Sequence, residues 1–253
     1  MTKPLDGKIA LVTGAKGGLG AAIAVALAEL GATLIVTGRK SGDCDATVAR
    51  VAAVGGKATD LALDVSDLAA IPARVHAALA LHGAVDILIN NAATIGPQAH
   101  LGDIDALEFD AAMRVNVSGP TALVAALWPS MRGRGGRIVN IVSGASNRAI
   151  SGWAAYCASK AALMMLTKSI ELEGAADGIR GFGLAPGLVD TDMQASIRAV
   201  RINDIGHVPR ENLLPPHKPA QLVAWLATGA ADDLAGQFLD IRQDGLMARA
   251  GLA

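Results

Sequence analysis

The feature that most restricts the fold of this 253-residue chain is a regular alternation of short apolar runs with longer helical stretches. Seven apolar runs predict strands at residues 9–13, 33–37, 58–63, 86–89, 137–142, 181–184 and 238–241. The stretches between them predict helices at residues 18–30, 43–54, 68–81, 104–131, 153–175 and 220–228. Near-continuous apolar strands that alternate with helices are typical of a parallel sheet covered on both faces. We therefore predict a single α/β domain with a doubly wound parallel sheet of about seven strands.

Composition and charge exclude several other classes of protein. The formal net charge is −1 without a block of like charge, so no nucleic-acid partner is expected. No apolar run reaches the length of a membrane span, and Lys3, Asp6 and Lys8 precede the first one, so neither a membrane segment nor a signal peptide is predicted. Two separated cysteines, Cys44 and Cys157, make no disulfide framework and favour a reducing cytoplasm. The five histidines show no metal-ligand spacing with them, so no metal site is expected.

A glycine-rich segment, Thr-Gly-Ala-Lys-Gly-Gly-Leu-Gly at residues 13–20, follows the first predicted strand and begins the first helix. Gly14 permits a tight turn, Gly18 lets the backbone approach a pyrophosphate, and Gly20 lets the helix pack on the strand. The helix N-terminus offers free N–H groups and a partial positive charge to phosphate. A glycine turn without a ligand is the alternative, but the position between strand and helix favours a dinucleotide site of the Rossmann type.

The spacing Thr-Gly-x3-Gly-x-Gly resembles that of the short-chain dehydrogenase/reductase family, and further family motifs follow in order. Asp64-Val65 resembles the pair that holds adenine, and residues 90–93 resemble the family's Asn-Asn-Ala-Gly, with Ala93 in place of glycine. Pro186-Gly187 with Thr191 resembles the segment that contacts the nicotinamide carboxamide. The resemblance implies a cofactor site formed by Gly14, Lys16, Gly18, Leu19, Gly20, Gly38, Arg39, Asp64, Val65, Asn91, Ala92, Tyr156, Lys160, Pro186, Gly187, Val189 and Thr191.

The end of the second strand bears on which nicotinamide cofactor is used. NAD-selective sites place a carboxylate there, on the ribose hydroxyls. Here the strand ends in Gly38, followed by Arg39, whose guanidinium suits a 2′-phosphate through paired hydrogen bonds. An ordinary solvated turn is the alternative interpretation. We predict NADP(H) as the preferred cofactor, with NAD(H) as the second choice.

Tyr156 and Lys160 lie four residues apart on a predicted helix and therefore share one face. Tyr156 is the only tyrosine in the chain. A phenol has a pKa of about 10, and a nearby ammonium, together with an oxidised nicotinamide ring, would lower it. Ser143 ends the strand before this helix and can hydrogen-bond a substrate oxygen, with Ser146 as a rival. The resemblance implies a catalytic set of Asn116, Ser143, Tyr156 and Lys160, in which Asn116 orders a water that links the lysine to solvent.

The substrate region is less defined by the sequence. Residues 189–216 lack clear periodicity and predict an irregular loop or lid. Residues 190–198 resemble the subgroup around sepiapterin reductase and benzil-type diketone reductases. An apolar pocket, and hence a hydrophobic ketone or diketone, is expected from the residues Ser143, Ala145, Asn147, Trp153, Leu188 and Met193.

Three function classes remain open at this level. A carbonyl reductase or alcohol dehydrogenase is favoured, and a 3-oxoacyl-thioester reductase is an alternative within that class. A non-catalytic nucleotide-binding regulator would not need the proton-transfer groups. The Thr-Gly-x3-Gly-x-Gly spacing and the expected single domain argue against an epimerase or dehydratase of the extended relatives. The helix at 153–172 is apolar nearly all round, which predicts a homodimer or homotetramer.

Overall fold

The computed structural model describes residues 2–252 and contains one sheet of seven parallel strands. The strands are β1 Ile9–Val12, β2 Thr33–Gly38, β3 Lys57–Ala62, β4 Ile87–Asn90, β5 Arg137–Ile141, β6 Arg180–Ala185 and β7 Phe238–Asp240. Their order across the sheet is β3-β2-β1-β4-β5-β6-β7. The predicted doubly wound sheet is confirmed, and every predicted strand overlaps an observed one.

The central strands are mostly apolar because both of their faces are buried, whereas the edge strand β3 is only partly buried and carries polar side chains. In β1, Ala10 and Val12 belong to one hydrophobic core, whereas Leu11 between them belongs to the other. In β4, Ile89 and Leu88 divide between the two cores in the same way. Successive side chains of a strand point to opposite faces, so a sheet covered on both sides needs an unbroken apolar run.

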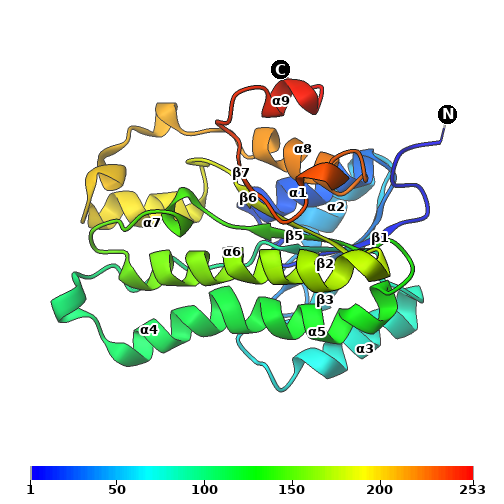
Figure 1. Ribbon diagram of the computed structural model, residues 1–253, viewed down its shortest axis with the longest axis horizontal. Coiled ribbons are helices and arrows are strands. Elements are labelled where there is room, and N and C mark those ends of the chain that lie inside the picture. Colours follow the sequence, from blue (N-terminus) through cyan, green and yellow to red (C-terminus); the bar gives the residue numbers. More distant parts are fainter. Residues whose placement is uncertain (1, 253) are drawn as a thin grey trace.

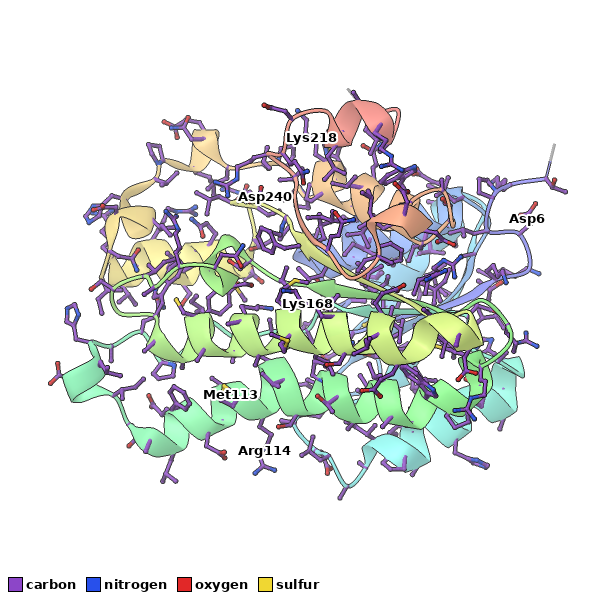
Figure 2. The ribbon with its side chains drawn as sticks, viewed as in Figure 1. Asp6, Met113, Arg114, Lys168, Lys218 and Asp240 are labelled. Atoms are coloured by element: carbon purple, nitrogen blue, oxygen red, sulfur yellow. The ribbon has the colours of Figure 1, made fainter. Side chains whose placement is uncertain are left out.

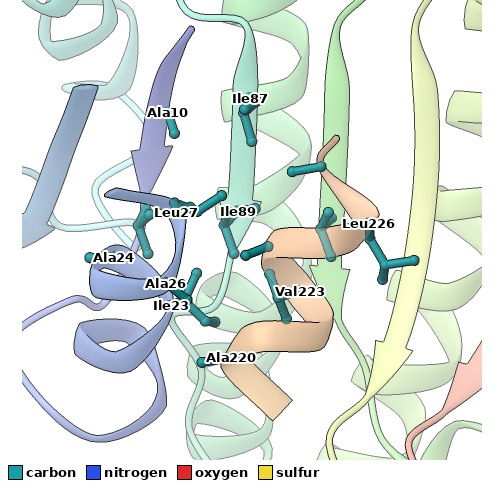
Figure 3. Close-up of a cluster of buried hydrophobic side chains, with 14 of the residues drawn as sticks. Ala10, Ile23, Ala24, Ala26, Leu27, Ile87, Ile89, Ala220, Val223 and Leu226 are labelled. Carbon is teal, nitrogen blue, oxygen red and sulfur yellow. The ribbon is translucent and has the colours of Figure 1, made fainter. Parts of the chain in front are cut away.

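Helices cover the two faces in two layers (Figure 1). One layer consists of α1 Gly18–Glu29, α2 Asp45–Ala53 and α8 His217–Leu226, and the other of α3 Ile71–His82, α5 Gly119–Met131 and α6 Ala154–Gly174. Figure 3 shows how α1 and α8 fit together over the sheet, with Leu27 and Val223 close to Ile89 of β4. Small side chains such as Ala220 on α8, next to Ile23 of α1, let the two helices approach closely, in line with the alanine-rich, aromatic-poor composition.

The strand order reverses at β1, which has β2 on one side and β4 on the other. The connections that leave β1 and β4 therefore run in opposite directions along the sheet. In open α/β sheets this leaves a crevice beyond the carboxyl ends of the strands, and ligands bind there.

The predicted helical region 104–131 is present but interrupted. It comprises α4 Ala106–Met113, a π-helical turn Arg114–Ser118 and α5, and Figure 2 labels Met113 and Arg114 at the junction. The Gly119 N–H donates to the carbonyl of Arg114, five residues back. Pro120 has no N–H to offer the carbonyl of Asn116, so regular helical bonding cannot continue across the junction.

The expectation of an irregular segment at 189–216 was wrong in part. The segment contains α7 Asp192–Val200 and two 3₁₀ turns, Asp204–His207 and Arg210–Asn212. Met193, Ile197 and Val200 follow helical spacing, but the prolines and glycine further along obscured this short pattern. A last helix, α9 Leu246–Arg249, was also not predicted. Across residues 2–252, no helix combines the length and the apolar character that crossing a membrane requires.

Candidate active site

A cavity of about 690 Å³ opens at the carboxyl ends of the strands, at the crevice that the strand order predicts. All residues that the sequence assigns to the cofactor site line it, from Gly14 on the first loop to Thr191 before α7. The chain positions these residues at the ends of five strands, β1, β2, β3, β4 and β6, and on helix α6, which carries Tyr156 and Lys160. Their contacts with a cofactor remain a prediction.

Three glycines of the loop after β1, Gly14, Gly18 and Gly20, lie where an added side chain would meet close neighbours. Gly14 has a φ of +64°, and an added Cβ would lie 2.9 Å from the Cα of Ala92. A Cβ on Gly20 would collide with the carbonyl oxygen of Gly14 and lie 2.6 Å from Nδ2 of Asn91. Gly18 has a φ of +52° and faces the Thr191 side chain. These positions require glycine because the loop is packed between β1, β4 and the start of α7.

Thr13 and Asn91 hold this loop to the end of β4. The Thr13 hydroxyl donates to the carbonyl of Ile89 at 3.2 Å and accepts from the backbone N–H groups of Asn91 and Ala92, both at 3.0 Å. The Asn91 amide donates to the carbonyls of Thr13 and Gly14, at 2.8 and 3.1 Å. Asn91 therefore shapes the cavity by fixing the loop.

The start of α1 fits a phosphate-bearing cofactor. In the described part of the chain no side chain caps this helix, whose N-cap residue is Gly17, and its first turn holds no acidic residue. The first N–H groups of a helix lack intrahelical partners and carry a partial positive charge. A phosphate beyond Gly17 and Gly18 would satisfy them, so the chain is shaped for a dinucleotide at this point.

Tyr156 and Lys160 lie one turn apart on α6, and both line the cavity. The Lys160 Nζ lies 5.6 Å from the centre of the Tyr156 ring and donates to the carbonyl of Ile141 at 2.7 Å. The Trp153 ring meets the Tyr156 ring edge-on, at 5.8 Å between centroids. Both residues of the pair are over nine-tenths buried, so the cavity holds a phenol and an amine that are almost removed from water.

Burial dominates the acid–base properties of this pair. It raises the pKa of Tyr156 to about 12, against which the nearby Ser143 hydroxyl acts weakly. It lowers the pKa of Lys160 to about 8, because a buried ammonium loses its hydration. The expected lowering of the tyrosine pKa is therefore not a property of the protein alone, since desolvation of the phenolate raises this pKa more than the Ser143 hydrogen bond lowers it.

Asn116 is buried and does not line the cavity. Its side chain is fully buried in the π-helical turn. Its Oδ1 accepts from the Thr94 N–H at 2.8 Å, and its Nδ2 donates to the Thr94 carbonyl at 2.9 Å and to the Ser159 hydroxyl at 3.0 Å. Ser159 donates in turn to the carbonyl of Tyr156. Asn116 thus couples the loop after β4 to the helix that carries Tyr156.

Ser143 follows β5 and lines the cavity, whereas its rival Ser146 does not. The Ser143 hydroxyl accepts from the Ala145 N–H at 3.2 Å, and the Ser146 hydroxyl accepts from the Ser143 N–H at 3.4 Å. This reciprocal capping closes a 3₁₀ turn, Gly144–Ser146. The turn fixes Ser143 at the cavity wall and directs the Ser146 hydroxyl back toward the backbone.

The substrate end of the cavity differs from the expectation at two residues. Trp153, Leu188 and Met193 line it, but Ala145 and Asn147 do not. The 3₁₀ turn buries Ala145 in a small apolar cluster with Trp153 and leaves Asn147 exposed. Sequence reasoning also missed several residues that line the cavity. Thr94 and Ile95 directly follow the Asn-Asn-Ala-Ala motif, and Gln194 and Ile197 follow Met193 on α7.

Comparison with known proteins agrees with this geometry. Residues 8–201 match the short chain dehydrogenase family. The chain is 35% identical over 238 residues to dehydrogenase/reductase SDR family member 4 of Oryctolagus cuniculus, covering 92% of each chain. It is 35% identical over 237 residues to the sorbitol dehydrogenase of Cereibacter sphaeroides, covering 93% of this chain and 90% of that enzyme.

A solved structure resembles the whole fold. The 3-oxoacyl-[acyl-carrier protein] reductase of Brucella melitensis, in complex with NAD, superposes with a TM-score of 0.83 at 30% identity, covering 94% of this chain and 96% of that one. This protein therefore belongs to the short-chain dehydrogenase family. It is an oxidoreductase of the NAD(P)-dependent kind that the family comprises.

The buried lysine predicts a specific dependence of stability on pH. The pKa of Lys160 is about 8 in the folded protein and 10.5 as its ordinary value, so the unfolded chain binds the proton more tightly between these values. Stability contributed through Lys160 therefore rises as the pH rises from about 8 to about 10.5. From pH ~7.5 to ~9.5 the wild type should gain about 2 kcal/mol relative to Lys160→Met, measured by urea unfolding. A constant difference between the two proteins across this range would contradict a lowered pKa of Lys160.

Proposed function

We propose that this protein is an NADP(H)-dependent carbonyl reductase that acts on a hydrophobic ketone or diketone, with Tyr156 as the proton donor. One observation carries the proposal. A buried tyrosine and a buried lysine, one helical turn apart, face the same cavity as a glycine loop shaped for phosphate. The combination joins a proton-transfer pair to a dinucleotide site, which is what reduction of a carbonyl group requires.

A bound nicotinamide supplies the hydride that reaches the carbonyl carbon of the substrate. Tyr156 donates its phenolic proton to the carbonyl oxygen, and the Ser143 hydroxyl holds that oxygen by a hydrogen bond. The raised pKa of Tyr156 keeps the phenol protonated at neutral pH, which is the state that reduction uses. The opposite direction, oxidation of an alcohol, needs the phenolate and is disfavoured until a positive charge reaches the site.

Lys160 and Asn116 act behind the tyrosine. Lys160 stabilises the phenolate as the proton leaves and binds the cofactor ribose through its ammonium. Asn116 completes the path by which a proton returns. One contact supports this order of groups: the Asn116 amide donates to Ser159, on the same helix as Tyr156. Pro120 also cannot donate to the Asn116 carbonyl as the corresponding residue of a regular helix would.

The preference for NADP(H) rests on the charges at the adenosine end of the cavity. Arg39 and Lys16 both line the cavity there, next to Gly38. A guanidinium and an ammonium together suit the doubly charged 2′-phosphate.

The substrate class follows from the walls beyond Tyr156. Trp153, Leu188 and Met193 are joined there by Ile95 and Ile197, so a substrate meets mostly apolar atoms and one proton donor. A 3-oxoacyl thioester is the second candidate, because the Brucella enzyme with that activity shares the fold over nearly the whole chain.

We further propose that the segment 189–216 acts as a lid over the substrate end of the cavity. Val189 pairs with Leu214 through the backbone, and the Asp190–Arg210 ion pair also joins the two ends of the segment.

Replacing Tyr156 by Phe tests the proton donor. The substitution removes one hydroxyl from a buried ring and keeps its packing against Trp153. Carbonyl reduction should fall by at least about 10³-fold because the proton donor is lost, whereas the dissociation constant for NADPH should change less than threefold. Turnover is followed by the absorbance of the reduced nicotinamide and binding by its fluorescence. Trp153→Phe is the matched control and should keep measurable turnover. Near-normal reduction by Tyr156→Phe would refute the assignment.

A substrate panel tests the cofactor and the substrate class together. Aromatic diketones, hydrophobic ketones and acyl-thioester ketones are offered with NADPH and then with NADH. We expect turnover of the diketones, with a kcat/KM for NADPH at least tenfold above that for NADH. Arg39→Leu should lower the kcat/KM for NADPH by about 10- to 100-fold, as expected when a charge-assisted pair of hydrogen bonds is lost. A clear preference for NADH would refute the proposed cofactor, and turnover of acyl thioesters alone would replace the proposed substrate class by the second candidate.

We also propose that the protein forms a homodimer or homotetramer in the cytoplasm. Three apolar side chains are 61–84% exposed: Leu107 on α4, and Met165 and Leu172 on α6. The helices α4 and α6 lie side by side (Figure 2). Burial of these side chains by a second copy would remove a costly apolar surface from water. Cys44 and Cys157 are both free thiols, in keeping with a reducing compartment.

Sedimentation equilibrium at micromolar concentration tests the assembly. We expect a mass of two or four chains for the wild type. A Leu107→Glu and Leu172→Glu double variant should sediment as monomers, whereas a change of the exposed Leu81 on α3 to Glu should not alter the mass. A monomeric wild type would rule the assembly out.

A further inference from the structure

The carboxylate of Asp43 lies where Gly38 lacks a side chain. A Cβ built on Gly38 would lie 2.5 Å from the Cβ of Asp43 and 3.1 Å from its Oδ2. Asp43 therefore fills the space that a side chain at the end of β2 would enter. The backbone of Gly38 lies outside the positive-φ region, so it is this occupied space, and not the backbone, that favours glycine there.

The surrounding turn holds the Asp43 carboxylate in place. Its Oδ2 accepts from the Lys40 N–H at 3.1 Å, and its Oδ1 accepts from the Lys16 Nζ at 3.1 Å. The Asp43 N–H closes the turn on the carbonyl of Lys40, and Gly42 donates to Asp60 at 2.6 Å. The hydrogen bonds from the Lys16 ammonium and the Lys40 N–H lower the pKa of Asp43 below its ordinary value, so the carboxyl group is ionised at physiological pH.

Three charges of mixed sign thus meet at the adenosine end of the cavity. Lys16 and Arg39 line the cavity, and Asp43 is the ion-pair partner of Lys16. A carboxylate has about four acceptor positions, and Lys16 and Lys40 occupy two of them. The remaining ones can accept from a ribose hydroxyl. A 2′-phosphate at the same place would meet a negative charge and would have to draw Lys16 away from Asp43.

We propose that Asp43 is a specificity-determining residue of the cofactor site, which binds the 2′-hydroxyl of an unphosphorylated adenosine ribose and weakens discrimination in favour of the 2′-phosphate. A carboxylate from five residues further along the chain takes the role of the one missing at Gly38. The enzyme accordingly uses NAD(H) better than Arg39 and Lys16 alone would allow. This inference rests on the proposed function, because it requires that a nicotinamide dinucleotide binds in the cavity.

Cofactor fragments test the role of Asp43 without any turnover. ADP-ribose and 2′-phospho-ADP-ribose, which differ only in the 2′-phosphate, are titrated calorimetrically at one fixed ionic strength. Asp43→Asn should weaken ADP-ribose about tenfold, because a charge-assisted acceptor is lost, and should bind 2′-phospho-ADP-ribose at least as tightly as the wild type. Asp45→Asn removes the same charge from an exposed position near the turn and should leave both affinities within twofold.

An exchange of the two positions provides the second test. In the double variant Gly38→Asp and Asp43→Gly, the carboxylate returns to the end of β2 and the space it needs is vacated. This variant should bind ADP-ribose within threefold of the wild type. The proposal would be overturned if Asp43→Asn left the ratio of the affinities for ADP-ribose and 2′-phospho-ADP-ribose unchanged. It would also be overturned if the exchange variant failed to recover ADP-ribose binding.

The same titrations separate the two proposals. A wild type that prefers ADP-ribose, with the ratio still shifted by Asp43→Asn, would remove the NADP(H) preference and keep the role of Asp43. A wild type that binds neither fragment would overturn both.

Discussion

The contact on which the site depends is the junction of β1 and β4 at their carboxyl ends. There the Thr13 hydroxyl and the Asn91 amide satisfy five backbone groups of the glycine loop and of β4. Buried backbone groups without partners are costly, so this arrangement fixes the loop conformation. It also holds Gly20 against the carbonyl of Gly14, which sets where α1 begins and where its free N–H groups point.

Removal of water is the second constraint on the site. Tyr156 and Lys160 are buried with one another, and burial moves their pKa values in opposite directions, up for the phenol and down for the amine. Both shifts favour neutral groups. The protein without its cofactor therefore keeps the Tyr156 phenol protonated at neutral pH, and Asn116 ties that helix to the loop after β4.

Much of this could be predicted from local patterns. Apolar periodicity predicts the strands and the main helices. Short motifs predict the cofactor-site residues, and all of these residues line the cavity. The errors lie where periodicity is short or where the chain turns sharply. The helix α7 is only nine residues long and is followed by prolines, and Ala145 is turned into the core by the capping of Ser143 and Ser146.

The sequence by itself determined the layered sheet, the glycine loop and the Tyr156–Lys160 pair, because each depends on residues that are close together along the chain. The tertiary structure alone decided which groups share a space. It brought Asn116 to Thr94 and Ser159, and it placed Asp43 in the position that Gly38 leaves empty. Charge and hydrogen-bonding partners depend on distance in space, and spacing along the chain does not specify that distance between elements. The pKa values of the buried pair were decided at the same level, because desolvation is a property of the whole packed core.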